Sequence, residues 1–518
     1  MYKKVLCASI AAVMICGLLA GCQGSNNSAA PTQAPANTQT SSNTQSSTTT
    51  AAEPAASTEL PYVTLTWYFP GTEPEERVMV EDKLEEFLKG QGLNCRMNLK
   101  FVDWGAWGDQ TNVMISSQEA FDIMFTAGWD GFLSKVNRGA FLDITDMWDK
   151  YLPKTKAMLP QVYFDSTIVK GRSYGVSTNK DLAHAWGIVY NSDMANELGI
   201  DMSKVKSIAD MSPVLEKVKS SYPDLIGIAM DRKDNTSTLL DWDPICAQEI
   251  PAKLYPNKDM VVVNEYATPE TAALLNTVRA LYLDGYIRSD AATLDDRRPD
   301  YEDGRAFCYT TTLKPFVEKN ITDRTGQVWQ QLAFTQPFIT SNDATGSINC
   351  VSVTSKNPER SLMFLELMNT DQYMNNLVNF GIEGVHFERV GETERKYMEG
   401  QNRQTVKYHA GADWQLGNQF LNYINAADNT PDKWDRFRAF NAAGKPSIAL
   451  GFVFDQDPVK TEISAVTNVK DQYCSSLFTG SVDPNEVLPQ FLQALKDAGI
   501  DKIVEEAQRQ LDAWAATR

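Results

Sequence analysis

The sequence Tyr62-Val63-Thr64-Leu65-Thr66-Trp67-Tyr68-Phe69 is rich in β-branched and aromatic residues and ends at Pro70-Gly71, so it predicts a strand. Apolar residues recur at helical spacing between 75 and 88, and a second strand is expected over 99–102. A short helix up to residue 117 then leads to a third expected strand over 122–125. Strand and helix alternate through this segment, which indicates an α/β fold with a parallel sheet.

Aromatic side chains stand at the carboxyl end of each of these expected strands. In open parallel sheets, ligands bind beyond the carboxyl ends of the strands. We therefore interpret these residues as ligand-binding, although each indole could instead pack in the core. They are Trp67 and Tyr68 after the first strand, Trp104 and Trp107 after the second, and Trp129 with Asp130 after the third.

Further along the chain, the segment 185–191 predicts another strand, which carries Trp186 as a further candidate ligand residue. The segment Leu240-Asp241-Trp242-Asp243-Pro244 places an indole between two carboxylates. Asp241 and Trp242 could hold a polyhydroxylated ligand by hydrogen bonding and stacking. The alternative is an exposed turn with an aromatic ring packed beneath it.

Strands expected over 307–311 and 347–353 are interpreted as returning to the first part of the fold. A chain that leaves one lobe and comes back implies two lobes with a hinge and a cleft between them. We assign residues 60–180 and 306–370 to the first lobe, and 181–305 and 371–518 to the second, with a helical carboxy-terminal region. Within the last segment, Glu383 and His386 lie in a glycine-bounded turn and are kept as candidate ligand residues, although a lone histidine is more often structural.

Composition excludes several classes of partner. The 518 residues are 43% hydrophobic and carry a formal net charge of −18, which argues against nucleic acid and against electrostatic binding to anionic lipid. The cysteines beyond residue 22 are widely spaced and odd in number, so we expect mostly buried thiols and no metal site. The sequence indicates no cofactor.

The amino terminus predicts a secretory signal. Lys3 and Lys4 precede an apolar run that ends at Leu19-Ala20-Gly21-Cys22, which resembles the bacterial lipobox. We expect a signal peptide over 1–21, a lipid anchor at Cys22, and a disordered polar tether over 22–59. The folded part would then work at the extracellular face of the cell membrane. The alternative is an ordinary cleaved signal.

Several stretches together resemble the extracellular solute-binding lipoproteins of bacterial ABC importers, namely family 1 and its LipO-like group with a carboxy-terminal domain of unknown function. They are residues 65–71, 121–127, 381–387, 451–455 and 458–463. The resemblance implies a two-lobed type II periplasmic-binding-protein fold. It also implies a monomer that closes on a sugar or oligosaccharide and delivers it to ABC permease subunits.

The sequence contains no H-E-x-x-H, P-loop or G-x-G-x-x-G motif, so we expect a binding protein and not an enzyme. A surface glycosidase is the main alternative, because acidic residues among tryptophans would suit one as well. Its catalytic carboxylates would be the pair Asp241 and Asp243 or the pair Glu383 and Glu388. A glycan adhesin without transport is a further alternative.

Overall fold

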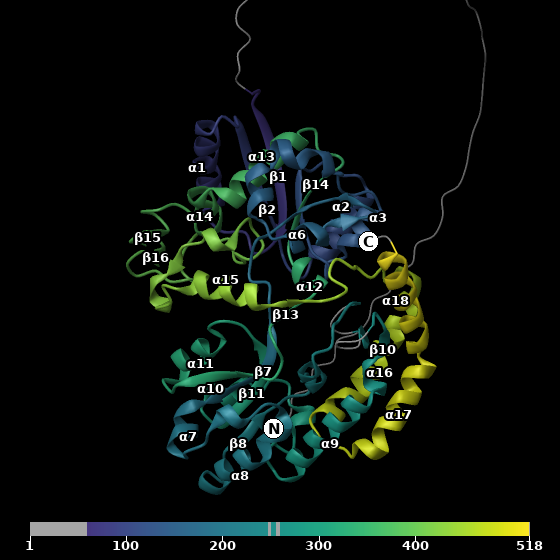
Figure 1. Cartoon of the computed structure of the whole chain (residues 1–518). Helices are drawn as coiled ribbons and strands as arrows, with labels where there is room; N and C mark the ends of the chain where they lie inside the picture. The colour runs from purple at the N-terminus through teal and green to yellow at the C-terminus, as the bar shows by residue number, and fades with distance from the viewer. Residues whose placement is uncertain (1–59, 247–249, 255–258, 517–518) are drawn as a thin grey trace, which may run out of the picture. The chain divides into compact units, whose positions relative to one another are not determined.

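The computed structural model describes residues 60–246, 250–254 and 259–516 (Figure 1). The predicted signal peptide, the predicted tether and the predicted anchor at Cys22 lie outside the described residues. Within those ranges, no helix combines the length and the hydrophobicity needed to cross a bilayer.

The first lobe is built on a sheet with the strand order β2-β1-β3-β14-β6 (Figure 1). The strands are β1 (Val63–Pro70), β2 (Cys95–Val102), β3 (Ile123–Thr126), β14 (Ile348–Val351) and β6 (Val176–Ser177). Because β1 is parallel to both β2 and β3, the predicted parallel sheet is confirmed. β14 is antiparallel to β3 and to β6, so a strand from far along the chain completes this sheet.

Helices cover this sheet and share its hydrophobic core. Leu65, Trp67 and Phe69 alternate along β1 and are fully buried on one face, as period-two packing requires. The helices of the lobe are α1 (Arg77–Gly90), α2 (Trp107–Ser116), α3 (Phe132–Asn137), α4 (Trp148–Tyr151), α5 (Pro153–Met158), α6 (Gln161–Ser166), α12 (Ser341–Ala344), α13 (Pro358–Thr370) and α14 (Gln372–Phe380). The short hairpin of β4 (Ile168–Val169) and β5 (Arg172–Ser173) lies between α6 and β6 in sequence.

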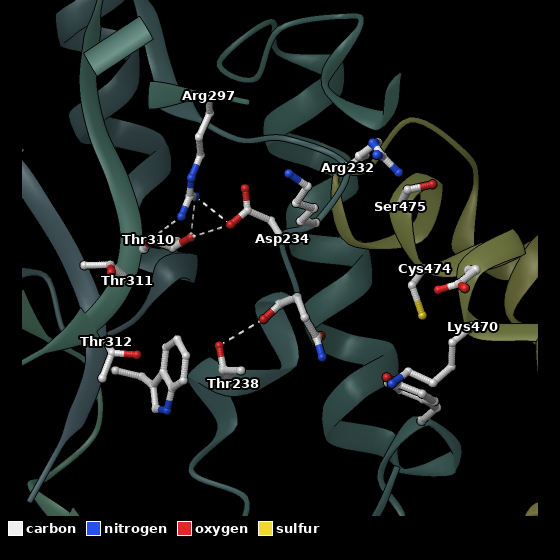
Figure 2. Close-up of a pocket in the computed structure, with 15 residues that line it drawn as sticks. Arg232, Asp234, Thr238, Arg297, Thr310, Thr311, Thr312, Lys470, Cys474 and Ser475 are labelled. Atoms are coloured by element: carbon white, nitrogen blue, oxygen red, sulfur yellow. Dashed lines mark hydrogen bonds and ion pairs between the residues drawn. The ribbon is translucent and has the colours of Figure 1, made fainter. Parts of the chain in front are cut away.

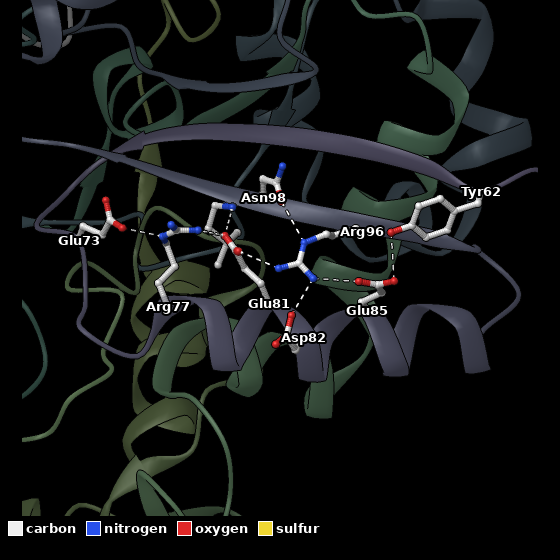
Figure 3. Close-up of polar contacts among 9 residues, drawn as sticks. Tyr62, Glu73, Arg77, Glu81, Asp82, Glu85, Arg96 and Asn98 are labelled. Atoms are coloured by element: carbon white, nitrogen blue, oxygen red, sulfur yellow. Dashed lines mark hydrogen bonds and ion pairs between the residues drawn. The ribbon is translucent and has the colours of Figure 1, made fainter.

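A buried carboxylate fastens α1 to the edge strand β2 (Figure 3). Glu81 accepts a 2.7 Å hydrogen bond from the backbone N–H of Leu99, which the sheet leaves without a partner on that side. The same carboxylate lies 2.5 Å from Arg77 Nη1 and 3.3 Å from Arg96 Nη2. Glu81 thus satisfies an edge-strand donor and shares its single negative charge between two guanidinium groups.

The second lobe has its own sheet, with the order β12-β7-β11-β8. The strands are β7 (Ala185–Asn191), β8 (Ile226–Ala229), β11 (Ala306–Leu313) and β12 (Trp329–Ala333). β7 is antiparallel to β11 and β12, whereas β8 is parallel to β11. Its helices are α7 (Ser192–Glu197), α8 (Ser212–Ser221), α9 (Pro269–Leu283), α10 (Arg298–Glu302) and α11 (Val317–Thr325).

This topology corrects part of the predicted lobe boundaries. The strand at 307–311 was expected in the first lobe, but β11 is hydrogen-bonded between β7 and β8 of the second. The segment after residue 370 was expected in the second lobe, yet Met374, Leu377 and Val378 of α14 are buried in the core of the first. The sequence of a segment shows whether it forms a strand, but the strand with which it pairs depends on distant residues. The sequence pattern therefore did not determine to which lobe each segment belongs.

Segments that run between the lobes pair with one another. His184 exchanges backbone hydrogen bonds of 3.0 and 2.8 Å with Phe338, and β13 (Phe338–Ile339) is parallel to β18 (Lys445–Pro446). A Cβ atom at Gly444 would lie 2.8 Å from the side chains of Ala183 and Ile339, so this close approach needs glycine. These crossings form the hinge region of the fold.

The remaining elements form two smaller parts. One contains β15 (Phe387–Val390), β16 (Glu394–Tyr397), β17 (Ile424–Asn425) and α15 (Lys433–Ala443). The other is the carboxy-terminal region, which has a core of its own beneath α16 (Lys460–Phe478), α17 (Pro484–Asp497), α18 (Ile500–Ala515) and the small sheet of β9 (Ala252–Leu254) and β10 (Val262–Asn264).

Candidate functional site

Tryptophan side chains from separate parts of the chain gather at the carboxyl edge of the first sheet. Trp104 follows β2, Trp129 follows β3, and the two remain 46% and 56% exposed. Their ring centroids lie 6.2 Å apart, and Trp104 lies a further 6.2 Å from Trp414. We call Trp104, Trp129 and Trp414 the tryptophan shelf. Large indoles held open to solvent at a strand edge offer apolar faces to a ligand.

Local hydrogen bonds hold the shelf in place. The indole N–H of Trp129 donates to the carbonyl oxygen of Gly346 at 3.1 Å. Next to it, a Cβ atom on Gly128 would lie 2.3 Å from Thr345 Oγ1, so a larger residue at this position would displace the Thr345 side chain. Asp103 accepts a 2.8 Å hydrogen bond from the N–H of Gly105 and so shapes the turn that carries Trp104.

Two of the predicted ligand tryptophans in the first lobe are buried, and this corrects their interpretation. Trp67 is fully buried and donates its indole N–H to Asn349 Oδ1 at 3.0 Å. Trp107 is buried beside Phe125, with ring centroids 6.1 Å apart. Both rings support the sheet and the shelf from within the core and present no free face. Tyr68 is half-buried against Phe121 on the opposite side of β1 from Trp67.

Asp130 also has a structural partner. Its carboxylate forms an ion pair with the buried ammonium group of Lys135 and accepts a 3.1 Å hydrogen bond from Thr126 Oγ1. Burial lowers the pKa of Lys135, while the Asp130 charge opposes that shift. The Asp130 carboxylate is therefore the counter-charge of the buried Lys135 ammonium group, and we assign it a structural role next to the shelf.

In the second lobe, Trp186 lines a pocket of about 730 Å³ (Figure 2). In the lining, Arg297 lies 2.5 Å from Asp234 Oδ1 and donates to Thr310 Oγ1 at 3.2 Å and to Thr310 O at 2.8 Å. Burial raises the pKa of Asp234 to about 6 despite this ion pair. Except for Trp186, the residues of this pocket carried no pattern that singled them out in the sequence.

The predicted group around Asp241 lies in a second pocket, of about 550 Å³. Asp241 is half-buried with a positive φ of 60°, and burial raises its pKa. Trp242 is only 8% exposed, so the expected indole between two accessible carboxylates is not present. Asp243 is buried and accepts a hydrogen bond from Ser447.

Glu383 and His386 lie in a separate turn near α1. His386 is buried, and its Nδ1 accepts a 2.8 Å hydrogen bond from the backbone N–H of Ile382. The ring proton is therefore on Nε2, which donates to Glu76 Oε2 at 2.9 Å. His386 joins this turn to the start of α1, while Glu383 is exposed to solvent. The geometry gives His386 a structural role.

Charged side chains also meet where the chain crosses between lobes. Lys314 forms an ion pair with Asp181, and His184 Nδ1 lies 3.0 Å from Asp343 Oδ1. Asp343 also caps α12, accepting from the Thr340 N–H at 2.7 Å. Burial opposes the charged form of Asp343, but the His184 and Thr340 hydrogen bonds lower its pKa overall. These contacts link the second-lobe residues to the segments that lead back to the first.

His409, near the shelf residue Trp414 in sequence, is expected to make the stability of the protein depend on pH. Burial lowers the pKa of its imidazole to about 3, with smaller effects from the charges of Arg403 and Arg395. In the unfolded chain the His409 imidazole binds a proton as pH falls below about 6.5. In the folded protein it does so only near its lowered pKa of about 3. We therefore expect stability to fall as pH decreases through this window.

Urea denaturation at pH 7 and pH 5 tests this expectation. His409→Gln keeps a polar side chain but has no titrating ring, so the variant should lose less stability than the wild type between the two values. Because the His409 ring is partly exposed, the two proteins should differ in their loss of unfolding free energy by less than the full pKa shift implies. An equal loss in both proteins would contradict the assignment to His409.

The residues that the structure describes form neither a metal-binding cluster nor a disulfide bond. No group of three or more His, Cys, Asp or Glu side chains within those ranges is placed to hold a metal ion. In the same ranges the cysteines are free thiols: Cys95, Cys246, Cys308 and Cys350 are buried, and Cys474 is half-buried.

The fold has two lobes, and comparisons with known proteins give the class of protein to which it belongs. Residues 73–299 match the family described as bacterial extracellular solute-binding protein, and residues 448–516 match a domain of unknown function, DUF3502. Over 446 residues the chain is 30% identical to a carbohydrate ABC transporter substrate-binding protein of Streptococcus pneumoniae, covering 84% of this chain and 88% of that protein. The chain therefore belongs to the extracellular substrate-binding proteins of bacterial ABC transporters, as the sequence resemblance predicted.

Solved structures support the same fold. The N-glycan transport solute-binding protein NgtS of S. pneumoniae superposes with a TM-score of 0.74 at 26% identity, covering 87% of this chain and 98% of that chain. For the NgtS complexes with Man1GlcNAc and Man5GlcNAc the TM-scores are 0.63 and 0.61. A solute-binding protein of Bifidobacterium longum infantis, 15% identical over 87% of this chain and 99% of that one, has a TM-score of 0.62 and shares the fold.

Proposed function

We propose that this protein captures an oligosaccharide on the tryptophan shelf and delivers it to the permease of an ABC importer. The observation that carries the proposal is the pairing of Trp104 and Trp129, two widely exposed indoles 6.2 Å apart at the carboxyl edge of the first sheet. Stacking on indoles supplies apolar contact to a sugar ring, and nearby polar groups read its hydroxyls. The names of the relatives support a carbohydrate as the ligand.

Closure of the lobes is the proposed mechanism of capture. A ligand that touches both lobes stabilises the closed state by its differential affinity for closed over open. The paired crossings at His184, Phe338 and Lys445 supply a compact hinge region.

We further propose a lipid anchor at Cys22, attachment at the extracellular face of the cell membrane, and a monomeric state. A lipobox-like sequence supports the anchor. The acidic net charge of −18 gives the protein no electrostatic attraction to anionic lipid, so acyl chains would be needed to hold it there.

A binding role is favoured over glycoside hydrolysis. A glycosidase needs an acid and a base or nucleophile that both reach the scissile bond. Asp243 is buried against Ser447, and Glu388 is paired with Lys396 at 2.8 Å, away from the shelf residues in the separate β15–β16 hairpin. We infer that neither predicted carboxylate pair acts on a sugar.

Isothermal titration calorimetry against neutral oligosaccharides tests this function. The panel contains Man1GlcNAc, Man5GlcNAc, kestose, cellopentaose and maltopentaose, each followed by analysis of the mixture for new reducing ends. We expect saturable binding of at least one member without turnover, and a decrease in the radius of gyration by X-ray scattering on binding. Release of reducing ends would favour the glycosidase, and no heat with any member would contradict the proposal.

A further inference from the structure

The pocket beside Trp186 has walls from two different parts of the chain (Figure 2). One wall is the second-lobe sheet, with Thr310, Thr311 and Thr312 of β11 next to Trp186 of β7. The facing wall is α16, which contributes Lys470, Asp471, Cys474 and Ser475. Helix α16 belongs to the segment that matches the domain of unknown function. The carboxy-terminal region therefore supplies one side of this pocket.

Polar side chains in the lining suit a hydroxylated occupant. The lining contains the hydroxyl groups of Thr238, Thr310, Thr311 and Thr312 and the amide of Asn235. These groups can donate and accept hydrogen bonds. Trp186 adds an aromatic side chain to the same lining.

The pocket lining carries charges of both signs. The positive side chains are Arg232, Lys233, Arg297 and Lys470, and the negative ones are Asp234 and Asp471. The guanidinium of Arg297 is engaged by Asp234 and by two oxygen atoms of Thr310. The guanidinium of Arg232 lies 2.6 Å from Asp295. Hydroxyl, carboxylate, amide and ammonium groups together suit the mixed donors and acceptors of a sugar unit.

Helix α16 is fixed to the second lobe. Arg279 of α9 donates to the carbonyl oxygens of Gly480 and Ser481, at 2.8 and 3.2 Å. A Cβ atom at Gly480 would lie 2.6 Å from the carbonyl oxygen of Val278, so the chain after α16 packs directly on α9. These contacts make both walls of the pocket part of one body.

We propose that the carboxy-terminal region is a specificity element: α16 and the second-lobe sheet together bind one sugar unit of the oligosaccharide, in addition to the units on the shelf. This inference rests on the proposed function. It assigns the matched domain a role in choosing the ligand. Oligosaccharides long enough to reach this pocket should gain affinity from it, and short ones should not.

Filling the pocket tests the inference. Ser475→Trp places an indole into the pocket from α16, and we expect it to weaken binding of the tightest-binding oligosaccharide of the panel about tenfold or more by calorimetry. Gln472→Trp is the matched control, because Gln472 is exposed on the same helix and does not line the pocket. The control should bind as the wild type does, and both variants should show the melting temperature of the wild type.

The outcomes separate this inference from the proposed function. If the wild type binds no member of the panel, the proposed function fails. If the wild type binds and Ser475→Trp binds equally well, the function stands and the inference is overturned. Should Ser475→Trp fail to fold, the milder double variant Asp471→Asn with Ser475→Ala decides: a loss of about threefold or more supports the inference, and unchanged affinity overturns it.

Discussion

Replacing Trp129 with alanine is expected to weaken oligosaccharide binding about tenfold or more, which corresponds to about 1.4 kcal/mol or more. The indole is 56% exposed and its N–H is already used by Gly346, so its free face contributes stacking area rather than a hydrogen bond. Truncation removes that area while leaving the buried core beneath it in place. Calorimetric titration of wild type and variant with the same panel member measures the change.

The control is an exposed aromatic residue outside the shelf. Tyr373 on α14 is 40% exposed and packs on Phe87, with ring centroids 5.1 Å apart. Tyr373→Ala should leave the affinity unchanged, and Trp129→Phe should recover much of the affinity lost by Trp129→Ala. Equal affinity in wild type and Trp129→Ala, with matching melting temperatures, would remove Trp129 from the binding surface.

The second large effect concerns stability. Glu81→Ala should lower the free energy of unfolding by about 3 kcal/mol, because a buried carboxylate that satisfies several groups is lost. The N–H of Leu99 at the sheet edge loses its acceptor, and Arg77 and Arg96 lose their shared counter-charge. Urea denaturation followed by tryptophan fluorescence measures the change.

Asp82 provides the matched comparison on the same helix. It pairs with Arg96 at 2.7 Å but its side chain is 63% exposed, so Asp82→Ala should cost less than about 1 kcal/mol. Glu81→Gln, which keeps an acceptor for the Leu99 N–H, should fall between the two alanine variants. Similar losses of unfolding free energy for Glu81→Ala and Asp82→Ala would show that the burial of Glu81 does not increase its contribution to stability.

The parallel sheet of the first lobe and two of the shelf residues could be predicted because their signals are local. Strands β1, β2 and β3 follow one another along the chain, and the rule for strand ends placed Trp104 and Trp129 at one edge. The same rule misplaced Trp67, which precedes the end of β1. Alternation with Leu65 and Phe69 assigns it to the buried face, and this signal could have excluded it.

Other features depend on contacts that no local pattern contains. Trp414 lies in an irregular segment hundreds of residues after Trp104, yet their rings meet. By contrast, the ion pair of Asp130 with Lys135 joins residues only 5 positions apart, so the spacing of the two charges could have suggested a structural role for Asp130. Whether β11 pairs in the first or second sheet depended on which strands lay beside it, and both choices were compatible with its apolar sequence.

The bond between Trp67 and Asn349 joins residues 282 positions apart, and β14 completes a sheet that β1 begins. While the chain is synthesised, its early strands must therefore wait for the later half before their core can close, which slows folding. For an exported polypeptide, slow folding would leave the chain unfolded until it has crossed the membrane. Burial of Trp67 would then depend on the arrival of the segment that carries Asn349.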